Sequence, residues 1–146
     1  MKKREGDPWM PADAYSKSLK GFGVNLLVQN VPVAVAFATE VLEAEAFYAD
    51  PDFALMRAQG AEWILHADHT YDSHPIHGSL AEGAHRGVGV ELRLHNMDPD
   101  AAEARARARG DVIFASALDK SHGLREAYMI DPDGYLWVVD RPTGKV

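Results

Sequence analysis

Two stretches of the chain alternate apolar and other residues with the period of a half-buried strand. They are residues 22–30 (FGVNLLVQN) and residues 88–96 (VGVELRLHN), and they align residue for residue, with Gly, Val, Leu and Asn recurring in place. The alternation predicts one apolar face on each strand. These faces consist of Phe22, Val24, Leu26 and Val28 in the first stretch and of Val88, Val90, Leu92 and Leu94 in the second.

A helix is predicted directly after each strand. Asn30 is a good N-cap for an apolar, alanine-rich helix over residues 31–42. Asp98 caps a second helix over residues 98–109, and Gly110 suits its C-terminal end. We expect this second helix to pack on its sheet through the slim face formed by Ala101, Ala104 and Ala108.

Three further strands follow in each half of the chain. They are predicted at residues 45–48, 53–59 and 60–65 in the first half and at 111–114, 124–130 and 134–139 in the second. The last pair shares a Gly-x-x-Trp motif, and residues 131–134 (DPDG) suit a type I turn. Each half thus consists of strand, helix, strand, strand, strand, which indicates an internal duplication.

A doubled βαβββ chain that ends in DPDGYLW (residues 131–137) resembles the vicinal-oxygen-chelate superfamily of glyoxalases, bleomycin-resistance proteins and dioxygenases. The preceding HGLREAY (residues 122–128) resembles the bleomycin-resistance-like branch. The resemblance implies an α+β fold in which two tandem modules form a cupped mixed sheet around a cavity. We therefore divide the chain into an N-terminal tail (1–20) and one glyoxalase-like domain (21–146), with module one at 21–80, a histidine-rich connection at 66–87 and module two at 88–142.

The resemblance also implies where a metal would bind. In metal-using members, each module supplies one ligand from the start of its first strand and one from its fourth strand. The matching positions here are Gly23, Ile64, Gly89 and Val138. Divalent metals in such sites need imidazole or carboxylate ligands, which these residues lack. We therefore expect no metal at the family position and no cofactor.

Polar residues follow each of these positions by two places, at Asn25, His66, Glu91 and Asp140. Two residues make one pleat, so these side chains share a face with the lost ligands, about 6–7 Å away. They are polar because they lie at a wet rim, because they contact a ligand, or because they hold a displaced metal. The ligand site that we predict consists of Asn25, Ile64, His66, His69, Tyr71, Glu91, Arg93 and Val138, with His66, Glu91 and His69 as candidate acid–base catalysts.

The connection between the modules is rich in histidine, at His66, His69, His74, His77 and His85. Imidazoles can bind metals or transfer protons near neutral pH. The Gly, Ser and Pro content of the same stretch is typical of a loop. A solvated linker, a flap over the cup and a metal site all remain open.

Two arginines stand beside acids, Arg93 near Glu91 and Arg125 near Glu126. They either recognise a ligand carboxylate or pair with these acids, and pairing is the role we expect.

The tryptophans divide into two kinds. Trp63 and Trp137 lie on the apolar side of their strands and are expected in the core. Trp9 and Tyr15 lie in an otherwise polar tail, where aromatic side chains are typical of a subunit interface.

Composition narrows the classes of function. The chain has 146 residues, 47% of them hydrophobic, which suits one compact domain. The absence of cysteine excludes thiol catalysis and disulfides. A net charge of −7 argues against nucleic-acid binding. Neither a membrane span nor the apolar core of a signal peptide is visible, so we expect a cytoplasmic protein that binds no membrane.

Two functions remain open. The first is a small-molecule-binding protein that sequesters a drug or metabolite without the family's metal site. The second is a lyase, isomerase or oxygenase-like enzyme that acts on a small oxygenated substrate with a displaced metal or none. Sequence alone does not assemble a nucleophile, base and orienting residue. The resemblance implies two partners, a small-molecule ligand and a second copy of the chain in a homodimer.

Overall fold

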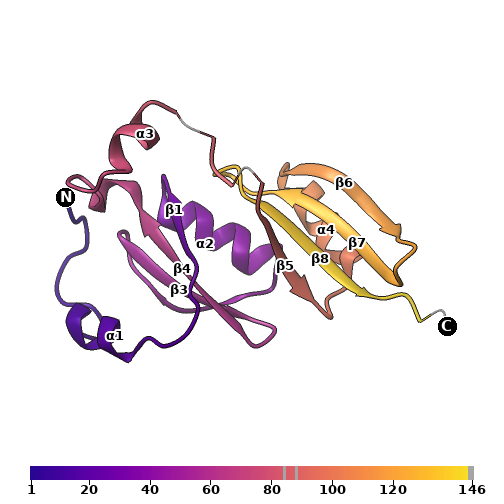
Figure 1. Cartoon of the computed structure of the whole chain (residues 1–146), viewed down its shortest axis with the longest axis horizontal. Helices are drawn as coiled ribbons and strands as arrows, with labels where there is room; N and C mark the ends of the chain where they lie inside the picture. Colours follow the sequence, from indigo (N-terminus) through magenta and orange to yellow (C-terminus); the bar gives the residue numbers. More distant parts are fainter. Residues whose placement is uncertain (84, 88, 145–146) are drawn as a thin grey trace.

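The computed structural model describes residues 1–83, 85–87 and 89–144, and contains two modules side by side (Figure 1). Each module has one four-stranded sheet and one long helix. The elements are α1 (Ala12–Ser18), β1 (Asn25–Val28), α2 (Val31–Glu40), β2 (Glu45–Ala49), β3 (Phe53–Ala58), β4 (Ala61–Ala67), the 3-10 turn η1 (Asp68–Thr70), α3 (His77–Ala81), β5 (Glu91–His95), α4 (Pro99–Arg109), β6 (Val112–Asp119), β7 (Leu124–Ile130) and β8 (Leu136–Pro142).

The two sheets have the same topology. Their strand orders are β1-β4-β3-β2 and β5-β8-β7-β6. In each sheet the first strand pairs in parallel with the fourth, and the other pairs are antiparallel. The second strand of each module also carries a register shift, next to Phe47 in β2 and around Phe114 in β6. The repeated βαβββ module and the α+β class predicted from the sequence are confirmed.

The long helices begin at the predicted caps. The Asn30 side chain accepts a hydrogen bond from the backbone of Val33, at 3.1 Å, and Asp98 accepts from the first turn of α4. Gly110 ends α4 in the left-handed conformation, with φ of 82°.

The predicted packing face of α4 is wrong. The buried residues are Pro99, Ala102 and Ala106, whereas Ala104 and Ala108 are exposed. Alanines occur on several sides of this helix, so its sequence does not specify a unique apolar stripe. Its rotation also allows the Arg105 guanidinium to donate to the carbonyl of Val41 in module one, at 2.8 Å.

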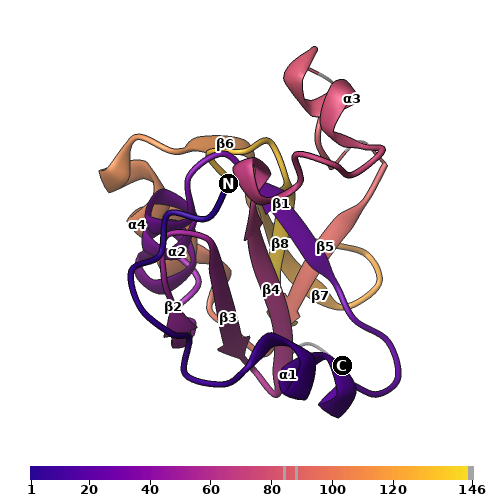
Figure 2. The ribbon, with the colours of Figure 1, turned by 90° about the vertical axis from the view of Figure 1, so that its left-hand side faces the viewer.

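One hydrophobic core joins the two modules. Trp63 and Trp137 are buried in it, with ring centroids 5.1 Å apart, as expected for the shared Gly-x-x-Trp motif. Helices α2 and α4 contact each other, and Figure 2 shows them next to one another. Leu26 and Val28 lie in this core, but Phe22 is 92% exposed because β1 begins only at Asn25. Val88 lies outside the described residues.

The face of each sheet that points away from its helix is called here the cup face. In module one, the N-terminal segment (residues 1–22) runs across this face, from the region of η1 down to α1 (Figure 2). The segment that follows module one is also held by hydrogen bonds to that module. Arg86 donates to the carbonyl of Leu27 at 2.7 Å and to Asp68 at 2.8 Å. None of the helices in the described ranges is long and apolar enough to cross a membrane.

Candidate ligand-binding site

The cup face of module one and the N-terminal segment enclose a cavity of about 300 Å³. Strand alternation turns Asn25, Ile64 and His66 toward it, because their neighbours on β1 and β4 face the core. Trp9 and Tyr15 of the N-terminal segment supply the opposite wall. A more open groove of about 780 Å³ adjoins the cavity and shares these residues except His66, so it offers an access route.

Aromatic side chains dominate the walls. Trp9, Tyr15, Phe53 and Tyr48 contact one another in a closed circuit, with neighbouring ring centroids 5.6 to 6.4 Å apart. Trp9 also lies edge-on to Phe47, at 5.4 Å. In this structure Trp9 and Tyr15 therefore contact module one of their own chain. Sequence reasoning missed Tyr48 and Phe53, whose positions on β2 and β3 carried no motif.

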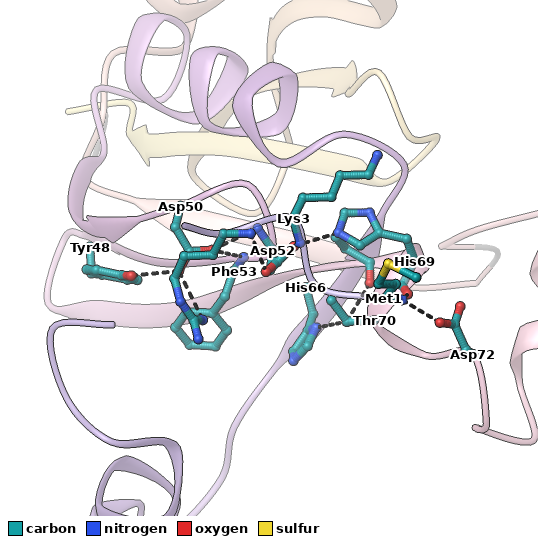
Figure 3. A network of polar contacts seen from close by, with 12 residues as sticks. Met1, Lys3, Tyr48, Asp50, Asp52, Phe53, His66, His69, Thr70 and Asp72 are labelled. Carbon is teal, nitrogen blue, oxygen red and sulfur yellow. Dashed lines mark hydrogen bonds and ion pairs between the residues drawn. The ribbon is translucent and has the colours of Figure 1, made fainter. Parts of the chain in front are cut away.

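His66 is held rigidly in the cavity wall. Its Nδ1 lies 2.7 Å from the Thr70 hydroxyl (Figure 3). Its ring makes edge contacts with Phe53, at 5.6 Å between centroids, and with Tyr71, at 4.8 Å. Burial lowers the pKa of His66 below its usual value. Tyr71 thus packs against His66, and burial raises the pKa of the Tyr71 hydroxyl.

His69, predicted as an acid–base candidate, anchors the N-terminal segment instead. Its Nε2 lies 2.6 Å from the buried carboxylate of Asp52, which also accepts hydrogen bonds from the backbone N–H groups of Lys3 at 2.7 Å and Arg4 at 3.0 Å (Figure 3). Burial alone would raise the pKa of Asp52, but these hydrogen bonds outweigh it and hold the pKa at about 2. Asp52 therefore stays ionised and fully engaged.

The other predicted site residues lie on the cup face of module two. Arg93 donates to Glu91 at 3.0 Å, to Glu126 at 2.5 Å and to Asp140 at 3.0 Å. Burial alone would raise the pKa of Glu126. Hydrogen bonds from Tyr128, His122 and Arg93 have the larger effect and lower this pKa to about 2. This is the pairing expected for Arg93.

Arg125 pairs differently from the expectation. It donates to Asp100 at 2.7 Å and to Asp119 at 3.1 Å, and its predicted partner Glu126 is bound by Arg93. Side chains next to one another in a strand point to opposite faces of the sheet, which separates Arg125 from Glu126.

The structure therefore divides the predicted set between two cups. Asn25, Ile64 and His66 line one cavity, whereas Glu91 and Arg93 are absent from its walls. Val138 is fully buried, opposite Arg93 in the register of β5 and β8. The buried cluster that joins the two modules comes from the helix-bearing sides of the sheets, and the described residues that line the cavity at His66 all belong to module one and the N-terminal segment.

The residues at the fold's metal positions do not fit a metal ion. Ile64 and Val138 are apolar side chains on β4 and β8, and the residues matched before β1 and β5 are Gly23 and Gly89. Within residues 1–83, 85–87 and 89–144, no group of three or more His, Asp or Glu side chains is arranged to hold one. The acids of module two surround the Arg93 guanidinium instead.

Comparison with known proteins supports the fold. No protein-family model matches the chain, and no curated protein matches it. A glyoxalase-related enzyme from Fulvimarina pelagi superposes with a TM-score of 0.65 at 17% identity, covering 84% of this chain and 88% of that one. A glyoxalase/bleomycin resistance protein/dioxygenase family enzyme from Burkholderia phytofirmans gives 0.65 at 16% identity, over 82% and 95%. A glyoxalase/bleomycin resistance protein/dioxygenase from Nocardioides gives 0.60 at 21% identity, over 92% and 97%.

Proposed function

We propose that this chain, which has the glyoxalase/bleomycin-resistance fold, is a small-molecule-binding protein that holds its ligand in the module-one cavity. The observation that carries the proposal is the cavity of about 300 Å³ between the cup face and the N-terminal segment. Its aromatic walls and its few polar groups, Asn25 and His66 among them, are the usual form of a small-molecule site. A drug or metabolite of modest size would be sequestered there.

The charged groups beside the cavity favour binding over catalysis. Asp52 is engaged by His69 and two backbone donors. Asp50 accepts from the Tyr48 hydroxyl at 2.6 Å and from the backbone of Phe53 at 2.9 Å. Groups that are already satisfied by the protein are poor acids, bases or nucleophiles, because a reacting substrate would have to displace their partners.

One observation favours a metal-independent lyase or isomerase as the second candidate. His66 is a half-buried imidazole with a lowered pKa on the wall of the cavity, which suits a general base near neutral pH. An enzyme of this kind would lose turnover in the variant His66→Asn while still binding its substrate. A binding protein would show no turnover in either form.

Nuclear magnetic resonance of the full chain tests the proposed site. Small aromatic compounds should shift the backbone amides of Asn25, Phe53 and His66. The variant Ile64→Trp should abolish these shifts, because the larger side chain fills the cavity floor. Val33→Trp is the matched control, since Val33 is 45% exposed on α2, outside the cavity. Shifts confined to the Arg93 cluster of module two would contradict the proposal.

A further inference from the structure

The hydrogen bonds of His66 determine which ring nitrogen carries the proton. The Thr70 hydroxyl lies 2.7 Å from the carbonyl oxygen of Ala67, which can only accept, so the hydroxyl donates its single hydrogen there. Toward His66 Nδ1, also at 2.7 Å, the same oxygen can therefore only accept. Nδ1 carries the proton, and Nε2 of the neutral ring keeps its lone pair.

The Nε2 atom is an acceptor, and the described part of the chain offers it no donor. No described residue hydrogen bonds it, and Figure 3 shows the ring edge that carries it directed away from Thr70 and from the Asp52 network. The edge contacts with Phe53 and Tyr71, together with the hydrogen bond to Thr70, restrict rotation of the ring. Nε2 is accessible from the cavity, so a ligand that donates to it gains the modest net free energy of one neutral hydrogen bond.

The remaining polar groups of the cavity disfavour a charged ligand. A cation would need a free carboxylate, but Asp50 and Asp52 each already accept from three groups of the protein. An anion would need a cation beside His66, but the Arg4 guanidinium lies 3.5 Å from Asp50, His66 is neutral, and Lys2 at the edge of the lining is exposed to solvent. The ligand that fits these conditions is a neutral molecule that donates a hydrogen bond and packs against the aromatic walls.

We propose that the cavity selects a small neutral aromatic molecule with one O–H or N–H donor, such as a phenol or an N–H heteroaromatic. The donor binds Nε2 of His66, and the ring packs among Trp9, Tyr15 and Phe53, where edge-to-face aromatic contacts are favourable. This inference rests on the proposed function and specifies the chemistry of its ligand.

Two matched probes test the donor requirement in the full chain. 2-Naphthol carries an O–H donor, and 2-methoxynaphthalene has the same ring system with the donor replaced by a methyl ether. Calorimetric titration should show 2-naphthol binding about 3- to 10-fold more tightly, which is the effect of one neutral hydrogen bond. His66→Phe should abolish this difference, so that the two probes bind the variant with equal affinity.

A nitrogen-detected NMR measurement tests the proton assignment without any ligand. The His66 ring should show a protonated Nδ1 and an unprotonated Nε2 at neutral pH, and 2-naphthol should shift the Nε2 resonance. Thr70→Ser keeps the hydroxyl and should preserve this tautomer. Thr70→Val removes the acceptor and should give a mixture of tautomers with a weaker preference for 2-naphthol.

The outcomes separate the two proposals. If neither naphthalene binds in the cavity, the proposed function itself is overturned. If both bind there with equal affinity, the cavity is a binding site but the donor requirement is overturned. A proton on Nε2 in the free protein would also overturn the inference, whatever the affinities.

Discussion

At the scale of single residues, the Asp131 carboxylate makes the stability of the protein depend on pH in the mildly acidic range. It accepts hydrogen bonds from the backbone of Asp133 and Tyr135 and from the Trp137 indole, at 2.9 to 3.0 Å. Burial nevertheless dominates and raises the pKa of Asp131 to about 6. Because this folded-state pKa lies above the unfolded value, the folded protein binds the proton more tightly. The resulting stability is present below about pH 4 and is lost as the pH rises through about 6.

We expect the variant Asp131→Asn to lack this dependence. Relative to the variant, the wild type should lose about 2–3 kcal/mol of unfolding free energy between pH 4 and pH 7, since one pKa unit corresponds to about 1.4 kcal/mol. Urea unfolding at a series of pH values measures it. Asp52 and Glu126 do not confuse the comparison, because their lowered pKa values place their loss of stabilisation below about pH 4. Parallel profiles for the two proteins would rule out the assigned role of Asp131.

Sequence reasoning placed some of these residues correctly and missed others for a physical reason. Strand alternation is local, so it identified Asn25, Ile64 and His66 as cup-facing. The segment that covers a sheet face can come from a distant part of the chain, and strand alternation does not reveal it. Asp52 resembles an ordinary turn residue until the backbone of the N-terminal segment meets it, and that contact spans 49 positions from Lys3. For the same reason, the sequence predicted a single ligand site, whereas the structure distributes its residues between the cup faces of the two modules.

At the scale of elements, caps and periodicity predicted the two long helices well. The helix expected over residues 98–109 is observed at Pro99–Arg109, and the one over 31–42 at Val31–Glu40. Strand β6 was predicted only as far as residue 114 but continues to Asp119. Its second half, rich in alanine and serine, has little strand preference of its own and is held by pairing with β7. Helix α1, which buries no residue, offered no apolar stripe to detect.

The N-terminal segment is an element whose anchoring can be tested directly. We expect the variant Asp52→Ala to remove hydrogen-exchange protection from the backbone amides of Lys3 and Arg4, because both donate to that carboxylate. Strands β3 and β4 should keep their protection, since their ladder does not depend on it. Amide exchange followed by NMR resolves these positions individually.

A control from the same segment excludes a general loosening. Asp13→Ala removes an exposed i,i+4 ion pair with Lys17, at 3.3 Å, and such pairs contribute little. It should leave the Lys3 and Arg4 amides unchanged. Equal exchange at these two amides in Asp52→Ala and in the wild type would show that Asp52 does not anchor the segment.

At the scale of the whole molecule, two features favour association with a second copy of the chain. Strands β1 and β5 are end strands, each hydrogen-bonded to a single neighbour within the described residues. Exposed strand edges are sites at which another chain can pair. Module two also exposes apolar side chains on β6, where Phe114 is 67% and Leu118 58% exposed. In module one the corresponding bulge residue, Phe47, is partly covered by Trp9.

We therefore expect the protein to be a homodimer whose interface covers the open cup of module two. Light scattering coupled to size-exclusion chromatography should give twice the 16.0 kDa chain mass. Phe114→Asp should shift the protein to the monomer, because a buried unpaired carboxylate in an apolar interface is costly. Val33→Asp places the same charge on another exposed apolar position, on α2, and should remain dimeric. A wild-type monomer, or a dimer that Phe114→Asp leaves intact, would show that this surface faces solvent. A new charge changes the measured mass only where the substituted residue lies in the dimer interface.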